Sequence, residues 1–187
     1  MDKVLLEAAI NEPNENFEKS FSKVINNKEY LFREKLKYQD TLQMIYLDIE
    51  CQLAKSDYLL FHGSVDLRIE VDRFKNEHRE YFNSLYVNPK ITSYGIGTQL
   101  MLEAFDVIRL LKEYYRINET ITFNGWLSIS DRNNGNWERS VPFYYHVGEL
   151  AQVNHYFLVC NNDCHINSVE EFFEAVGDTD GTIVYEI

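Results

Sequence analysis

The feature that most constrains the fold is a strand, a glycine-bearing loop and a helix that follow one another in residues 86–101, YVNPKITSYGIGTQLM. The apolar strand ends before Pro89, because proline cannot donate a hydrogen bond to a ladder. Gly95 and Gly97 follow, in a chain of only eight glycines, and a helical pattern starts at Thr98. The N-terminus of a helix offers unpaired N–H groups and a positive dipole end, and glycines let a phosphate approach. The sequence therefore predicts an anion site here, although a flexible turn explains the same glycines.

The first third of the chain shows helical spacing. A helix capped by Asn14 or Asn16 would bury Phe17, Phe21 and Val24, and the pair Asn26-Asn27 would end it. A second helix is expected over about 28–56, because apolar residues recur there at three and four positions: Leu42, Ile45, Ile49 and Leu53.

The remainder of the chain changes period. Val65, Leu67, Ile69 and Val71 alternate with charged residues, which predicts a strand. Ser168-x-x-Glu171 resembles a capping box before a further helix. The pattern predicts strands at 81–87, 118–129, 154–160 and 182–187, a polar loop at 131–136, and helices at 98–116, 137–146 and 168–176. We therefore expect one α/β (α+β) domain over residues 1–187, with a mixed, mostly antiparallel sheet flanked by helices, residues 1–58 being mainly helical and 59–187 holding the sheet.

The charge excludes one class of partner. The chain carries 18 basic and 30 acidic residues, a net charge of −12, so a nucleic-acid ligand is not expected. A cationic or amine partner fits this balance, and so does simple solubility. No apolar run is long enough for a membrane span, and the N-terminal residues lack the basic region of a signal peptide. The expected compartment is the cytoplasm, and no membrane partner is expected.

Two metal-binding patterns are present but weak. The three cysteines, Cys51, Cys160 and Cys164, are too sparse for a disulfide framework, and the last two are spaced too widely for a zinc knuckle. Asp48 and Glu50 in YLDIECQ would share a face only on a strand, whereas the surrounding spacing is helical. No metal is expected.

Two stretches resemble the GNAT superfamily of acyl-CoA-dependent N-acetyltransferases, over about residues 60–160. Val87-x-Pro89, five residues, then Gly95-x-Gly97-Thr98-x-Leu100 is similar to motif A, and Ser140-x-x-Phe143-Tyr144-x-x-x-Gly148 is similar to motif B. The chain departs from the family pattern at three positions: Thr92 in place of Arg or Gln, Trp137 in place of Asn, and Glu149 in place of an aromatic residue.

The resemblance implies a GNAT-like fold, acetyl-CoA (acyl-CoA) as co-substrate, and direct attack by a primary amine. It implies cofactor contacts from Leu85, Tyr86 and Val87 to the pantetheine arm, from Tyr94, Gly95, Ile96, Gly97 and Thr98 to the pyrophosphate, and from Asn136 and Ser140 in the second motif. Tyr144 falls on the tyrosine that protonates the departing thiolate. Residues that could act as the base are Glu70, Asp72 and Asp131.

Several alternatives stay open. Tyr144 also stands in an aromatic stretch where it could serve packing alone. The acceptor could be a small molecule or a peptide amine, and both a monomer and a homodimer are compatible with the sequence. The departures at Thr92 and Trp137 motivate a second hypothesis, a catalytically inactive GNAT-like protein with a binding or regulatory role.

Overall fold

The computed structural model describes residues 3–39, 44–53, 61–72, 77–87, 95–116, 118, 120–159 and 162–187. The chain forms two compact units, Met1–Glu119 and Thr120–Ile187. The expectation of a single domain over 1–187 stays a prediction.

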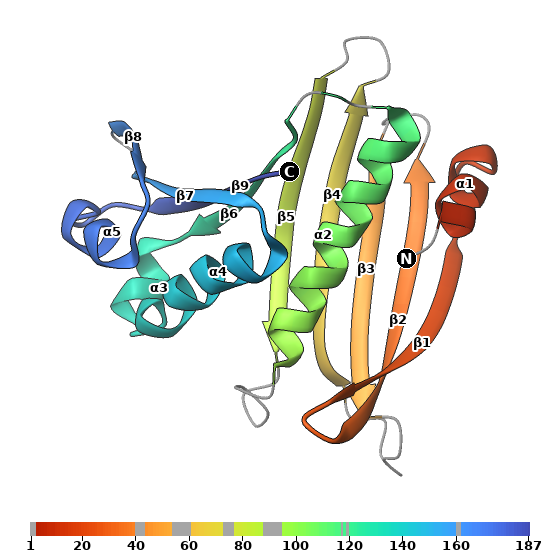
Figure 1. Ribbon diagram of the computed structural model, residues 1–187, viewed down its shortest axis with the longest axis horizontal. Coiled ribbons are helices and arrows are strands. Elements are labelled where there is room, and N and C mark those ends of the chain that lie inside the picture. The colour runs from red at the N-terminus through yellow and green to blue at the C-terminus, as the bar shows by residue number, and fades with distance from the viewer. Residues whose placement is uncertain are drawn as a thin grey trace. The chain divides into compact units, whose positions relative to one another are not determined.

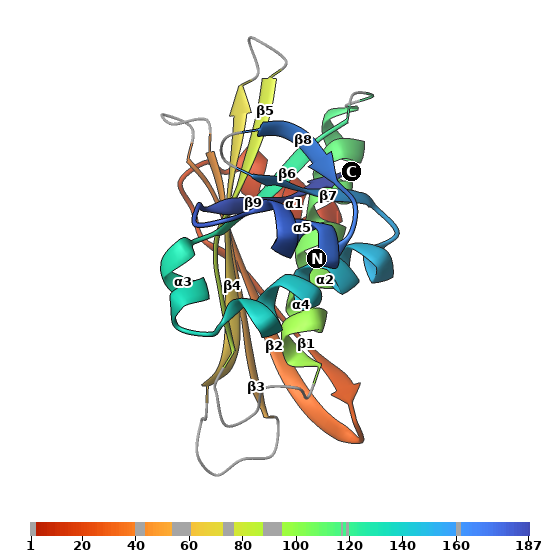
Figure 2. The same cartoon turned by 90° about the vertical axis from the view of Figure 1, so that its left-hand side faces the viewer.

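The first unit is an antiparallel sheet with two helices on one side. Its strands are adjacent in chain order, from β1 to β5, and each consecutive pair is antiparallel. Figure 1 shows α2 lying along the strands, and Figure 2 shows the strands nearly edge-on with α2 on one side of them. The elements are α1 (Lys3–Asn11), β1 (Phe17–Ile25), β2 (Lys28–Gln39), β3 (Met44–Leu53), β4 (Phe61–Asp72), β5 (Glu77–Val87) and α2 (Ile96–Tyr115).

The prediction of a helical N-terminal third is wrong, because residues 17–53 form three strands. Asn26 and Asn27 do form the predicted break, but as a two-residue hairpin turn with φ of 49° and 60° that joins paired strands. Along β2 every second side chain is buried: Tyr30, Phe32, Glu34, Leu36 and Tyr38.

This alternation in β2 is hidden in the sequence because a charged residue, Glu34, occupies one of the buried positions. In β3 the buried residues Ile45 and Ile49 are four apart, which satisfies a helical as well as a strand period. Asn14 adopts φ of 72° after the short helix α1, so it does not cap a following helix.

The core of the first unit lies between the sheet and its helices. Leu6 and Ala9 of α1 are fully buried, and α1 contacts β1 and β2. The longer helix α2 contacts β3, β4 and β5. Its buried stripe includes Leu100, Ala104 and Ile108, as the sequence predicts.

The second unit is a smaller antiparallel sheet with three helices. Its strand order is β6-β9-β7-β8, so the last strand of the chain pairs with both β6 and β7. The elements are β6 (Thr122–Leu127), α3 (Ile129–Asn133), α4 (Trp137–Ala151), β7 (Asn154–Val159), β8 (Asn162–Ile166), α5 (Val169–Ala175) and β9 (Gly181–Glu186).

The predictions for the second half of the chain are confirmed with two exceptions. Strands β4, β5, β6, β7 and β9 and helices α2, α4 and α5 lie where expected, and the Ser168 hydroxyl accepts a hydrogen bond from the Glu171 N–H at 3.1 Å. The expected polar loop at 131–136 begins inside α3 instead, because Ser128 caps that helix by accepting from the Ser130 N–H. The sequence interpretation also missed β8. The fold is mixed α/β with antiparallel strands flanked by helices.

Candidate functional site

The start of α2 has the backbone geometry that the glycine pattern predicts. Gly95 is the residue before the helix, with φ of 81° and ψ of 3°, a left-handed conformation that favours glycine. Ile96, Gly97 and Thr98 form the first turn, which contains no acidic residue. The first N–H groups of a helix have no partner inside the helix, and no carboxylate of this turn competes for them. Gly95 is exposed, Thr98 is half-buried, and Ile96 and Gly97 are buried. Tyr94, Thr92 and Pro89 lie outside the described residues.

The β1–β2 hairpin packs beside this helix start. A Cβ placed on Gly95 would lie 3.5 Å from Cγ2 of Ile25, an ordinary contact, so it is the backbone angle that requires glycine there. Farther along, Lys23 forms a salt bridge with the buried Glu103, and Nε2 of Gln99 donates to Oε1 of the same carboxylate at 2.6 Å. The helical misinterpretation of residues 17–24 concealed this contact between β1 and α2.

The predicted pantetheine residues are at the end of β5. Leu85, Tyr86 and Val87 pair in register with Val65, Ser64 and Gly63 of β4, and Val87 is the last residue of the strand. The β4–β5 register shifts between Asp66, which pairs with Ser84, and Leu67, which pairs with Phe82. A bulge or irregularity therefore lies directly before these three residues of β5.

The motif B residues lie on α4 in the second unit. Asn136 precedes the helix without a side-chain capping bond, its N–H donates to the Asp131 carbonyl at 2.9 Å, and its carbonyl accepts from the Ser140 N–H at 2.9 Å. Trp137, where the family has an amide, is 1% exposed and packs against Phe172. Trp137 is therefore a core residue of the second unit.

Tyr144 is half-buried on α4. Burial raises its pKa to about 12, and the Asp131 carboxylate acts in the same direction. Its carbonyl accepts a hydrogen bond from the Tyr185 hydroxyl at 2.8 Å, which ties α4 to β9. The structure thus brings Tyr144 and Asp131, two residues selected from the sequence, into electrostatic range, and the phenol is protonated at neutral pH.

The glycine of motif B is required by packing. A Cβ on Gly148 would lie 2.6 Å from Cγ of His155, so α4 approaches β7 too closely for any side chain. The His155 ring is fixed by contact of its Nδ1 with the Val153 carbonyl at 3.0 Å and by an edge contact with Tyr145. Gly148 therefore positions the helix that carries Tyr144.

The other sequence-selected residues are dispersed. Glu70 and Asp72 lie in β4, in register with Arg79 and Glu77 of β5. Cys51 is buried in β3, and burial raises the pKa of its thiol to about 12, so it is not an activated nucleophile.

The geometric argument against the rival metal motif is wrong, since Asp48 and Glu50 share a face of strand β3. Both face Lys35, whose Nζ lies 3.9 Å from the Asp48 carboxylate and 2.7 Å from that of Glu50. They are therefore engaged in ion pairs. Within the part of the chain that the structure describes, no group of three or more His, Cys, Asp or Glu residues could hold a metal. No helix of the described ranges is long and apolar enough to cross a membrane.

Comparison with known proteins finds similar chains among solved structures. No family model matches the sequence, and no curated protein matches it. Among solved structures, a chain of the "Crystal structure of the NatC complex bound to Gag peptide and CoA" is similar with a TM-score of 0.44 and 15% sequence identity. The match covers 75% of this chain and 70% of that chain.

Proposed function

We propose that this chain is an acyl-CoA-dependent N-acyltransferase that transfers an acetyl group from acetyl-CoA to a primary amine. The observation that carries the proposal is the start of α2. A left-handed Gly95 opens a helix whose first turn is free of acidic residues, at the spacing that motif A requires after Val87. The motif B residues Ser140 and Tyr144 support it, because they lie on one helix, as the resemblance implies.

The amides of the first turn of α2 are suited to the pyrophosphate. They offer donors at the positive end of a 20-residue helix, and Gly97 adds no side chain between backbone and phosphate. The expected Arg or Gln side chain is absent at Thr92, so these amides would carry more of the interaction. Leu85, Tyr86 and Val87 would offer backbone groups to the pantetheine arm.

Tyr144 would act as the general acid. The amine nitrogen attacks the thioester carbonyl, the C–N bond forms, the C–S bond breaks, and the departing sulfur takes a proton while the amine loses one. A phenol of pKa about 12 keeps its proton until that moment. Full transfer to a thiolate with a pKa of about 8.5 is uphill, so the sulfur would need its own pKa raised by burial. Asp131, whose charge acts on Tyr144, is the base that we propose.

Binding is tested with acetyl-CoA and the full chain by calorimetry and thermal melting. Specific binding would raise the melting temperature with ligand concentration. Gly95→Ala should weaken binding about tenfold or more, because the left-handed residue cannot be kept without strain. Gly177→Ala is the matched control: Gly177 also has a positive φ, 53°, and open space at its Cβ. An absence of binding by the unmodified chain would overturn the proposal.

Catalysis is tested separately, by release of free CoA with simple primary amines and basic peptides as acceptors. Tyr144→Phe should lower the rate by about 10²- to 10⁴-fold while binding of acetyl-CoA persists. Tyr145→Phe is the control, since it removes a neighbouring hydroxyl whose partner is the Asn167 carbonyl at 2.8 Å. An unchanged rate in Tyr144→Phe would remove Tyr144 as the acid. Binding without any transfer would favour the alternative, an inactive binding or regulatory protein, as the buried Trp137 suggests.

A further inference from the structure

The sheet of the second unit has one face that its helices do not fill. Strand register places Trp126 opposite Thr182 and Thr182 opposite Leu158, and it places Asn124, Val184 and Tyr156 in the next row. The alternate residues, such as Phe123, Phe157 and Ile183, are fully buried. Val184, in the centre of the first set, is 2% exposed, and we call the accessible members, Asn124, Trp126, Tyr156, Leu158 and Glu186, the open face.

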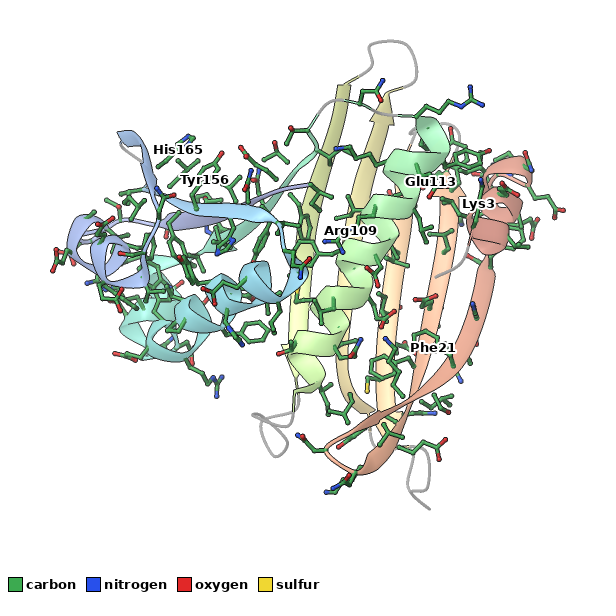
Figure 3. All side chains as sticks on the ribbon, viewed as in Figure 1. Lys3, Phe21, Arg109, Glu113, Tyr156 and His165 are labelled. Atoms are coloured by element: carbon green, nitrogen blue, oxygen red, sulfur yellow. The ribbon has the colours of Figure 1, made fainter. Side chains whose placement is uncertain are left out.

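The open face carries one exposed aromatic side chain, Trp126, and one half-buried aromatic side chain, Tyr156. Trp126 is 63% exposed, whereas the other tryptophan, Trp137, is 1% exposed. Tyr156 stacks on the exposed His165 of β8, with ring centroids 4.0 Å apart and an angle of 8° between the ring planes; Figure 3 labels this pair. Among the residues whose burial the structure describes, the other large exposed apolar side chains are Val4, Val24 and Leu150, which lie on other elements.

The negative net charge of this unit favours a positively charged partner. Residues 120–187 contain 10 acidic and two basic residues, a net charge of −8, compared with −4 from 20 acidic and 16 basic residues in 1–119. The two arginines, Arg132 and Arg139, lie on α3 and α4, so none of the four strands carries a lysine or arginine. On the open face, burial raises the pKa of the Tyr156 phenol, and the charge of the Glu186 carboxylate and its hydrogen bond with Tyr156 act in the same direction.

We propose that the open face of the second unit binds an arginine- or lysine-rich peptide segment of a partner protein. A guanidinium can stack on the exposed indole of Trp126 and pair with Glu186, while the aliphatic part of the side chain covers Leu158. The absence of basic residues from the strands opposes an acidic peptide or a nucleic acid. This binding surface is independent of the proposed acyl transfer.

The test is calorimetric titration of the full chain with an oligoarginine peptide that is acetylated at its N-terminus. Such a peptide has no primary amine, so its binding does not depend on acyl transfer. We expect saturable binding that weakens with salt, and a change in tryptophan emission that arises from Trp126, since Trp137 is enclosed. An oligoglutamate peptide and a neutral oligosaccharide are the comparison ligands.

Three variants locate the binding. Trp126→Ala should lower the affinity about three- to thirtyfold, and Glu186→Gln about two- to fivefold. Leu150→Ala, which removes an apolar side chain that is 48% exposed on α4, should bind as the wild type does. Thermal melts of each variant establish that it is folded. The proposal is overturned if oligoarginine does not bind at low salt, if Trp126→Ala binds equally well, or if oligoglutamate or the sugar binds as tightly.

Discussion

The two units stabilise their sheets by different means. In the first unit, charged residues reach the interior: Glu34 and Glu103 are buried, and they are the only buried charged side chains among the residues whose burial the structure describes. In the second unit the core is aromatic, with Phe172 in contact with both Trp137 and Phe157. The first unit also holds 16 of the 18 basic residues.

This difference shows where specificity arises in each unit. A buried ion pair adds little net stability compared with an apolar pair, but breaking it is costly, so it fixes one arrangement of β1 against α2. An aromatic core gains stability from the apolar area that its rings bury and from their close packing. Such packing requires small residues where a ring approaches the backbone. Gly181 illustrates this, since a Cβ there would lie 2.5 Å from Cζ of Phe172.

The largest expected effect is on the aromatic core. Phe172→Ala should lower the free energy of unfolding by about 3–5 kcal/mol, because a fully buried ring at 4.5 Å from Phe157 is replaced by a cavity. Phe21→Ala in the first unit removes a half-buried ring that stacks on Phe32 at 5.5 Å, and should cost about 1–2 kcal/mol. Denaturant titration followed by circular dichroism measures both. Equal losses of stability in the two variants would show that aromatic packing does not contribute more to the second unit than to the first.

The next effect concerns the ion pair between β1 and α2. Lys23→Met removes the cationic partner of the Glu103 carboxylate, which is 6% exposed, and leaves it only the hydrogen bond from Gln99. The free energy of unfolding should fall by about 2–4 kcal/mol. The double variant Lys23→Met/Glu103→Met should recover most of this loss, because it leaves no unpaired buried charge at position 103. Lys35→Met, on the opposite side of the sheet, should cost 1 kcal/mol or less, since its pair with Glu50 is about one-third exposed. A double variant as unstable as Lys23→Met would contradict a charge-based explanation.

The sequence predicts the second half of the fold better than the first for a physical reason. Around Val65–Val71 the alternation is regular, and at Ser168 a capping residue marks the helix start, so local pattern and fold agree. In β2 the buried position of Glu34 breaks the apolar alternation, and the strand is covered by α1, a separate element of the chain. A local pattern cannot reveal which strand positions a distant element will bury.

The features of the candidate site that depend on local sequence can be predicted, as for the fold, and those that depend on packing between elements cannot. The sequence predicts the role of Gly95 because a left-handed residue before a helix is a local requirement, and Asp131 and Tyr144, both candidates from the sequence, lie in electrostatic range. The core role of Trp137 and the contact between Gly148 and His155 depend on packing between α4, α5 and β7, which sequence spacing does not encode.

The smallest expected effect is the pH dependence contributed by Glu34. Burial raises its pKa above 4.5, and the charge of Glu103 adds to the shift. Between 4.5 and the raised pKa the folded state keeps a proton that the unfolded state has released, so the free energy of unfolding falls as pH rises through this window and levels off above it.

Glu34→Gln removes this titration, so its stability relative to the wild type should rise with pH across the window, by about 1.4 kcal/mol for each unit of pKa displacement. Unfolding curves at a series of pH values measure the difference. The matched control is Glu50→Gln, which alters a carboxylate on the exposed side of the same sheet and should show no such rise, because it loses a favourable pair with Lys35 at 2.7 Å. If Glu34→Gln instead becomes less stable than the wild type as pH rises, the attraction of nearby positive charges, the N-terminal ammonium and Lys19, outweighs the burial of Glu34. The first unit would then resemble a conventional ion-paired sheet, and the contrast with the second unit would rest on aromatic packing alone.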